Sequence, residues 1–178
     1  MGSGLSGVSR KGVLGKGKLE AGRTRGGNDG LHRLRLTVSI QVMETDASSK
    51  MIQRVRNDRF AKMIGARLVE AAPGQAVAEL ELSEHHLNGV DRVQGGVIFT
   101  LADYAFAAAS NAEGFPTVGV NVNISYFRAP RGPVIRAVAR EIQAGKRICG
   151  YQVDVLDADG SLVASFAGMG YRKPELAD

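Results

Sequence analysis

The segment formed by residues 88–111, NGVDRVQGGVIFTLADYAFAAASN, constrains the fold of this 178-residue chain more than any other stretch. It starts as a polar loop that carries glycines and continues into a helix dominated by Ala, Val, Ile, Leu and Phe. A helix that is apolar on nearly all sides belongs in the middle of a domain, because only there is every face covered. The sequence therefore predicts one long central helix wrapped by other elements.

One carboxylate, Asp103, interrupts the apolar run of residues 97–109. Burying an ionised carboxylate costs on the order of several kcal/mol unless the group is paired or hydrated. We therefore expect Asp103 to face a wet cleft and to have its charge used there.

The first turn of the predicted helix has the features of an anion site. Gly95 and Gly96 leave this turn without side chains, so that backbone N–H groups can approach a ligand closely. Together with the positive end of the helix dipole, these N–H groups suit the oxyanion of an acyl-transfer intermediate.

The distance between these two features predicts a dimer. Asp103 lies eight residues after Gly95, which corresponds to roughly 12 Å along a helix axis. Reacting groups must lie within about 3–3.5 Å of their target atoms, so a single helix cannot apply both groups to one small carbonyl. Two antiparallel copies related by a two-fold axis can do so. If both groups are catalytic, the protein must be a dimer.

The remaining pattern indicates an α+β domain. Residues 51–65 have apolar side chains at mostly helical spacing and end at Gly65, a common helix stop. Two segments of strand character, which look like a hairpin, precede the central helix and four follow it; since no helical pattern lies among these four, neighbours should pair antiparallel. A curved antiparallel sheet of about five or six strands wrapped around the helix would bury all its sides. The strand segments are 66–72, 76–82, 117–127, 134–142, 148–157 and 162–172.

The net charge of +5 resides in the N-terminal part of the chain. The first 50 residues hold nine of the 23 Lys and Arg and four of the 18 Asp and Glu, so the remaining 128 residues are formally neutral. This balance gives no support for a nucleic-acid surface on the folded part. We expect residues 1–50 to be a disordered or non-native Gly-rich extension, with a targeting or nucleic-acid-binding arm as the alternative, and residues 51–178 to form the domain. Within the extension, residues 31–42 could pair as an edge strand.

Cysteine usage and hydropathy indicate the compartment. The single cysteine, Cys149, excludes an intramolecular disulfide and suits a reducing environment. The chain has no apolar run long enough for a membrane span. A cytoplasmic protein that binds neither membranes nor nucleic acid is expected.

The central segment resembles the hotdog-fold acyl-CoA thioesterases, and specifically their PaaI-type (phenylacetate-pathway) branch. The resemblance covers about residues 59–171 and rests on Asn88, the Gly95-Gly96 pair and Leu101-Ala102-Asp103. Members commonly read H-x-N-x-x-G-x-x-H-G-G-x-x-x-x-L-A-D here. His86 matches, whereas Asp91 stands where the second loop glycine is usual, and Gln94 stands where a His precedes the glycine pair.

The resemblance implies a catalytic role for five residues. The N–H of Gly95, aided by Gln94 or Asn88, would polarise the thioester oxygen, since a Gln or Asn amide can donate a hydrogen bond. Asp103 of the other subunit would act as general base on water or attack the carbonyl directly. Asn121, where relatives often carry a small polar residue, would hold the water. For Asn88 a plain turn role is the alternative.

The resemblance also implies an acyl-CoA substrate, a homodimer that often pairs into a tetramer, and no separate cofactor, because coenzyme A is part of the substrate. Gly96 would contact the substrate, and four basic residues in or beside the late turns would hold the phosphates of coenzyme A, with solvated surface charge as the alternative. These are Arg128, Arg131, Lys146 and Arg147.

No metal site is expected, because the adjacent His85 and His86 tend to point apart and no third ligand completes a set. His86 is expected to pack or form hydrogen bonds near the base of the loop. Two other functions remain open: an acyl-CoA binder or sensor, which would not need Asp103, and a hydroxyacyl-thioester dehydratase, which would need a catalytic His.

Overall fold

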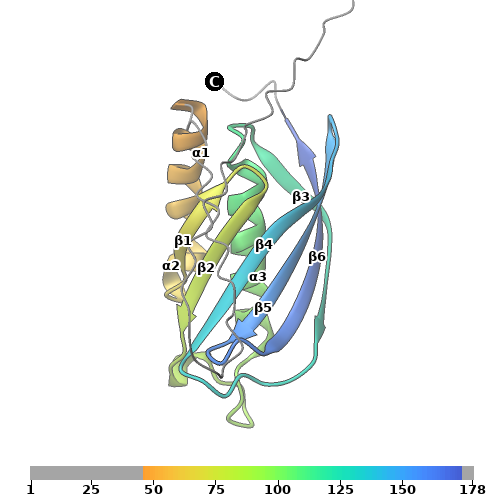
Figure 1. Ribbon diagram of the computed structural model, residues 1–178. Helices are drawn as coiled ribbons and strands as arrows, with labels where there is room; N and C mark the ends of the chain where they lie inside the picture. Colours follow the sequence, from red (N-terminus) through yellow and green to blue (C-terminus); the bar gives the residue numbers. More distant parts are fainter. Residues whose placement is uncertain (1–45, 174–178) are drawn as a thin grey trace, which may run out of the picture. The chain divides into compact units, whose positions relative to one another are not determined.

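A computed structural model describes residues 46–173 (Figure 1). The expected extension therefore lies almost wholly outside the described residues, as does the possible strand at residues 31–42. The helices are α1 (Asp46–Arg56), α2 (Arg59–Met63), a 3-10 turn (Glu84–His86) and α3 (Gly95–Asn111). The strands are β1 (Arg67–Ala72), β2 (Gln75–Glu81), β3 (Thr117–Tyr126), β4 (Val134–Ala144), β5 (Ile148–Asp157) and β6 (Leu162–Arg172).

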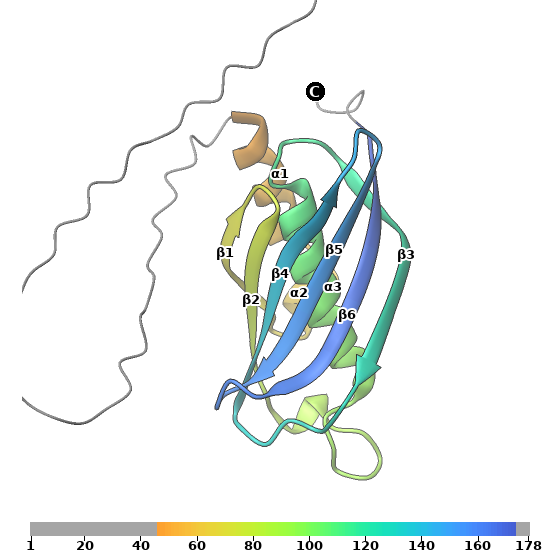
Figure 2. The ribbon, with the colours of Figure 1, turned by 45° about the vertical axis from the view of Figure 1, so that its right-hand side comes forward.

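The six strands form one antiparallel sheet in the order β1-β2-β4-β5-β6-β3. The sheet curves around α3, with β1 at one edge and β3 at the other (Figures 1 and 2). This arrangement confirms the α+β class and the hotdog architecture, in which one long helix lies in the hollow of a wrapped sheet.

The inner face of the sheet and α3 share the core. Leu101, Ala102 and Ala105 of α3 are fully buried. Phe106 meets the ring of Tyr151 edge-on, with the ring centroids 5.4 Å apart, and its centroid lies 5.9 Å from that of Phe166. Since β5 alternates buried and half-buried residues along its length, one face of the strand meets the helix.

The four late strands do not all pair with their neighbours in the sequence. The predicted pairs β4–β5 and β5–β6 are confirmed, but the predicted pair β3–β4 is wrong, because β3 pairs with β6. The physical reason lies in the connection between β3 and β4. Its prolines lack the N–H that a ladder needs, and the buried carboxylate of Asp157, at the end of β5, accepts hydrogen bonds from the N–H groups of Arg131 and Gly132. These hydrogen bonds hold the connection at the end of β5, and β3 lies at the edge of the sheet, away from β4.

The expected helix over residues 51–65 is two helices. The break falls at Asn57 and Asp58, where the Asp58 side chain accepts a hydrogen bond from the N–H of Ala61 (2.8 Å) and so starts α2. Gly65 has φ 77°, which fits the predicted stop. Helix α1 begins at Asp46 and so crosses the expected domain boundary at residue 51.

Helices α1 and α2 contact α3, on the side that the sheet leaves open (Figure 1). No helix among residues 46–173 is both long enough and apolar enough to cross a membrane.

Candidate functional site

The start of α3 is capped by Gln94. Its Oε1 accepts a hydrogen bond from the N–H of Val97 (3.2 Å), so part of this side chain serves the helix and not a ligand. A Cβ at Gly96 would lie 2.7 Å from the same oxygen, so a larger residue at position 96 would displace the end of the Gln94 side chain. The N–H groups of Gly95 and Gly96 have no acceptor within the described part of the chain. Two backbone donors are therefore available at the predicted anion site, with Gln94 beside them, and the binding of an oxyanion there stays a prediction.

Tyr126, at the end of β3, holds the glycine pair from the other side. Its hydroxyl donates a hydrogen bond to the carbonyl oxygen of Gly95 (2.9 Å). A Cβ on Gly95 would lie 3.4 Å from the Tyr126 ring, so the two residues are in close contact. Sequence reasoning missed Tyr126, because nothing in the strand pattern of residues 117–127 shows that its last residue reaches the start of the helix.

Asn88 closes the loop that precedes the helix. Its Oδ1 accepts hydrogen bonds from the N–H groups of Val90 (3.0 Å) and Arg92 (3.1 Å), as a turn residue does. Asp91 in this loop has φ 53°, in the left-handed region that glycine favours and Asp tolerates. The left-handed turn explains why Asp can stand at a position where the family pattern has glycine. A role of the Asn88 amide towards a substrate stays a prediction.

His86 is held by the backbone at the base of this loop. Its Nδ1 accepts a hydrogen bond from the N–H of Ser83 (3.0 Å), so its Nε2 carries the proton and donates to the carbonyl oxygen of Ile64 (2.9 Å). The expectation that His86 forms hydrogen bonds at the loop base is confirmed. Within residues 46–173, no three or more His, Cys, Asp and Glu side chains gather into a possible metal site.

Asp103 is half-buried on α3 and borders two hollows. Burial raises the pKa of its carboxyl above the usual value, and the negative charge of Asp58 raises it further. The expectation that this carboxylate faces a cleft is confirmed. A carboxylate with a raised pKa is a stronger base once it is ionised, which suits proton abstraction.

The first hollow lies between α3 and β3. Its volume is about 370 Å³, and it brings Asn121 to the same space as Asp103, as the sequence predicts. A β-bulge between Gly119 and Asn121 interrupts the regular register with β6, so consecutive residues of β3 border this space. Its lining is Phe99, Asp103, Gly119, Val120, Asn121 and Val122.

The second hollow lies between α3 and the α1–α2 segment, and has a volume of about 310 Å³. Asp58 and Asp103 both border it, and most of the other residues that line it have apolar side chains, two of them alanines. The full lining is Val55, Asp58, Phe60, Ala61, Thr100, Asp103, Tyr104 and Ala107.

The four basic residues predicted to hold phosphates lie at opposite ends of β4. Arg128 and Arg131 precede β4, and Lys146 and Arg147 follow it. The 11 residues of β4 span roughly 33–37 Å, so one subunit does not bring the four side chains together.

Arg128 is already paired, since its guanidinium lies 3.2 Å from Asp157 and 3.5 Å from Asp159. At the other end of β4, the Arg147 guanidinium lies 5.9 Å from the ring centroid of Tyr171. The side chains of Arg131 and Lys146 are exposed. Binding of coenzyme A by these four residues stays a prediction.

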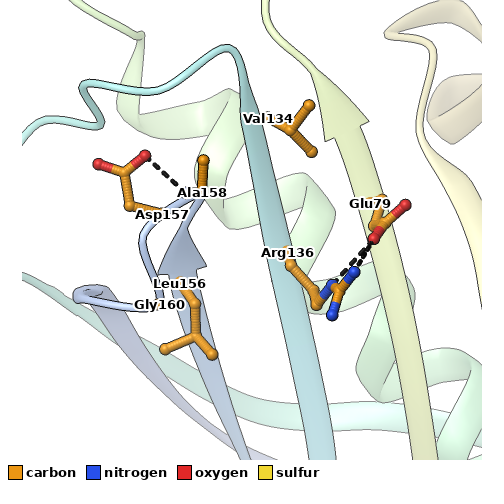
Figure 3. Close-up of a pocket in the computed structure, with 7 residues that line it drawn as sticks. All are labelled: Glu79, Val134, Arg136, Leu156, Asp157, Ala158 and Gly160. Atoms are coloured by element: carbon orange, nitrogen blue, oxygen red, sulfur yellow. Dashed lines mark hydrogen bonds and ion pairs between the residues drawn. The ribbon is translucent and has the colours of Figure 1, made fainter.

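A further hollow lies on the sheet, away from α3 (Figure 3). It contains an ion pair between Glu79 of β2 and Arg136 of β4, and it extends to Asp157 at the end of β5. None of the residues predicted to act on a substrate lies in it.

Comparison with known proteins identifies the family. The sequence pattern of the thioesterase superfamily matches residues 92–164. An esterase-like protein of Archaeoglobus fulgidus is 33% identical over 148 residues, which are 80% of this chain and 96% of that protein. The acyl-coenzyme A thioesterase PaaI of Escherichia coli is 32% identical over 117 residues, which are 65% of this chain and 84% of that enzyme.

The structure of the E. coli PaaI protein from the phenylacetic acid degradation operon superimposes with a TM-score of 0.68 and 27% sequence identity, over 73% of this chain and 96% of that chain. The predicted resemblance is thereby confirmed. This chain belongs to the thioesterase superfamily, and its relatives include hotdog-fold acyl-CoA thioesterases of the PaaI type.

Proposed function

We propose that this chain hydrolyses a small or medium acyl-CoA thioester to a carboxylic acid and free coenzyme A, in a site formed between two subunits. The observation that carries the proposal is the pairing of two features on α3. Asp103 is a half-buried carboxylate beside a hollow, and the glycine pair at the helix start has N–H groups without an acceptor among the described residues.

The exposed edge of the sheet supports a dimer. β3 is an edge strand of ten residues whose side chains are mostly exposed, including Val118 (44%) and Val120 (54%). A long apolar edge strand is a template for pairing with another chain. If β3 pairs with its two-fold copy, the two α3 helices run antiparallel and Asp103 of one subunit approaches Gly95 of the other.

The reaction follows from these positions. The N–H groups of Gly95 and Gly96 receive the thioester oxygen, on which negative charge develops. Asp103 of the other subunit takes a proton from a water held by Asn121 while the water oxygen bonds to the carbonyl carbon, or its carboxylate attacks that carbon directly. The carbon–sulfur bond then breaks, and the coenzyme A thiolate leaves and takes up a proton. No metal or separate cofactor takes part.

The cap formed by Gln94 supports the oxyanion site indirectly. Because Gln94 occupies the N–H of Val97, the first two N–H groups of the helix are the ones left for a ligand. The exposed side chains of Arg131 and Lys146 can attract the phosphates of coenzyme A, whereas Arg128 would first have to leave Asp157.

The alternative functions have less support. A hydroxyacyl-thioester dehydratase needs a catalytic imidazole, and both ring nitrogens of His86 are engaged by backbone groups. A simple acyl-CoA binder has no use for a half-buried carboxylate, which costs stability.

A free-thiol assay with a panel of acyl-CoA thioesters tests the proposal, because only hydrolysis releases coenzyme A. Asp103→Asn, which keeps the side-chain shape, should abolish turnover while light scattering still reports a dimer. Asp154→Asn, on the half-buried Asp154 of β5, is the matched control and should keep wild-type rates. Unchanged hydrolysis of all thioesters by Asp103→Asn would disprove the mechanism.

A further inference from the structure

Asn88 is followed by Gly89, and no other asparagine of the chain precedes a glycine. The backbone nitrogen of the residue after an asparagine can attack the side-chain carbonyl carbon. This ring closure is easiest before glycine, because a peptide unit without a Cβ turns most freely. The remaining asparagines, at positions 28, 57, 111, 121 and 123, precede Asp, Ala, Val or Ile. The sequence therefore marks position 88 as the one at which loss of the amide is expected first.

Gly89 lies in the exposed loop between the 3-10 turn and α3, which extends past the start of that helix (Figure 2). Its neighbour Val90 is 74% exposed. A Cβ at position 89 would meet nothing within 4 Å, so the peptide unit can turn without a collision. The N–H of Gly89 has no backbone acceptor among residues 46–173. The attacking nitrogen is therefore unengaged there, and solvent can remove its proton.

The side-chain amide of Asn88 is held by its oxygen alone. Oδ1 accepts hydrogen bonds from the N–H groups of Val90 (3.0 Å) and Arg92 (3.1 Å), whereas Nδ2 donates to no group in the described part of the chain. When a nucleophile adds to Cγ, negative charge develops on Oδ1, and two N–H donors stabilise that charge as an oxyanion site does. The nitrogen that must leave is not held. The turn therefore favours reaction at Cγ.

We propose that Asn88 is a site of spontaneous covalent modification, in which its side chain closes a ring with the backbone of Gly89. The nitrogen of Gly89 bonds to Cγ of Asn88 and gives up its proton, the Cγ–Nδ2 bond breaks, and Nδ2 leaves with a proton as ammonia. One water molecule then opens the five-membered imide. Cleavage between Cγ and the Gly89 nitrogen gives aspartate. Cleavage at the other carbonyl gives isoaspartate, in which the main chain runs through the former side-chain carbonyl.

The modification would switch off the proposed active site, a consequence that rests on the proposed thioester hydrolysis. An ionised carboxylate at position 88 accepts hydrogen bonds but cannot donate one to the thioester oxygen. It also places a negative charge in the loop before the helix start, where the oxyanion is to develop. The aspartate can keep the hydrogen bonds from Val90 and Arg92 as charge-assisted ones. The modified subunit should therefore stay folded while it loses activity.

Mass spectrometry of the aged protein tests the chemistry without reference to activity. The full chain is kept for several days in mildly alkaline buffer and digested with trypsin. The peptide of residues 68–92 contains Asn88 as its only asparagine, and the peptide of residues 93–128 contains three others. The first should lose its amide and give separate aspartate and isoaspartate peaks, while the second stays unchanged. Equal modification of both peptides, or of neither, would overturn the proposal.

Gly89→Ala is the matched control. The φ of Gly89 lies outside the left-handed region and the space for a methyl group is open, so alanine fits the folded loop. The variant should lose the amide of Asn88 at least about tenfold more slowly than the wild type, because the Cβ restricts the peptide unit that has to turn. Equal rates in the two proteins would contradict ring closure through this nitrogen.

A synthetic peptide of residues 68–92 separates the effect of the turn from that of the sequence. If the two donors on Oδ1 promote the reaction, the folded chain should convert at least as fast as the peptide in the same buffer. A folded chain that keeps Asn88 while the peptide loses its amide would show that the turn protects the side chain, and the proposal would fall.

Activity is measured in parallel on the same samples. Thiol release per subunit should fall in proportion to the modified fraction, with an unchanged thermal melt, and Asn88→Asp should have a kcat/KM at least about tenfold below that of the wild type. Aged Gly89→Ala should keep its activity. Full activity in a fully modified sample would break the link to the active site. If fresh protein releases no thiol from any acyl-CoA, the proposed hydrolysis fails, while the mass measurement still decides the modification.

Discussion

The hydroxyl of Tyr126 donates a hydrogen bond of 2.9 Å to the carbonyl oxygen of Gly95. This carbonyl belongs to the same peptide unit as the N–H of Gly96, which is one of the two donors of the proposed oxyanion site. The hydrogen bond fixes the orientation of that peptide and polarises it, so Tyr126 strengthens the donor without touching the substrate. Tyr126 is therefore a positioning residue.

We predict that Tyr126→Phe lowers kcat by about three- to tenfold, because a neutral hydrogen bond contributes about 1 kcal/mol. KM should change little, since the ring that packs on Gly95 remains. Steady-state kinetics with one acyl-CoA and a thermal melt check this. The control Ser165→Ala also removes one hydroxyl, on β6, and should not change kcat. An unchanged kcat in Tyr126→Phe would mean that the hydrogen bond has no part in catalysis.

Gly95→Pro removes one of the two proposed oxyanion donors, the backbone N–H of residue 95, and is compatible with the start of the helix. Proline is favoured at the first position of a helix, and Gln94 has φ −69° and ψ 133°, which is the conformation a residue before proline prefers. We expect an intact fold by circular dichroism and a loss of about 10²- to 10³-fold in kcat. Near-wild-type kcat in a folded variant would place the oxyanion elsewhere.

Mixing two inactive variants tests whether the site is shared between subunits. A heterodimer of Gly95→Pro and Asp103→Asn chains has one site with both defects and one with neither. If the variants are refolded together in equal amounts, activity should return to about a quarter of the wild-type value, because half of the dimers carry one intact site of two. Absence of any recovery, with heterodimers demonstrated by mass spectrometry, would mean that each subunit works alone.

The pH dependence of the reaction should respond to Asp58. Burial and then the charge of Asp58 raise the pKa of Asp103, so removal of that charge lowers the pKa and leaves the base ionised at lower pH. In Asp58→Asn the acidic limb of kcat/KM, measured between about pH 4 and pH 8, should shift to lower pH. Glu70→Gln, on an exposed residue of β1, should not shift it. A limb that stays in place would separate Asp58 from the catalytic base.

Asp157 should be required for stability. Burial alone would raise the pKa of this carboxyl, but the N–H groups of Arg131, Gly132 and Ala158, together with the guanidinium of Arg128, hold it below its usual value. Loss of these hydrogen bonds in Asp157→Ala should lower the free energy of unfolding by about 3 kcal/mol in urea titrations at neutral pH.

The sign of the pKa shift also predicts how this contribution varies with pH. Because the folded-state pKa of Asp157 is lowered, its contribution is complete above the unfolded-state pKa and disappears as the pH falls through the folded-state value. The difference in stability between the wild type and Asp157→Ala should therefore shrink in acid. A difference that is the same at all pH values would mean that the charge of Asp157 is not what stabilises the connection.

The sequence predicts the elements of the fold better than their order. The apolar helix and the alternating strands follow from periodicity, which is a local property. β3 pairs with β6, and the connection that follows β3 is held by Asp157, from a position 25 residues beyond Gly132. A contact between such distant residues leaves no periodic signal, so the order of the strands could not be predicted.

In the candidate site, too, features that follow from the local sequence could be predicted, and contacts between distant residues could not. Asp103 could be predicted because a carboxylate in an apolar helix is costly, and the glycine pair because its spacing from Asp103 resembles a family pattern. Tyr126 and Asp58 could not be predicted, since each meets α3 only through tertiary packing. The cap formed by Gln94 is local, and a Gln just before a helix start was a signal that could have been interpreted this way.

The contact between Gln94 and Gly96 has a consequence for how this turn can vary. The carboxamide of Gln94 occupies the space that a methyl group at position 96 would need. A mutation of Gly96 to alanine would push the carboxamide away and leave the N–H of Val97 without its side-chain acceptor. The side chains tolerated at position 96 therefore depend on the residue at position 94, and a library that varies both positions together would reveal combinations that single substitutions miss.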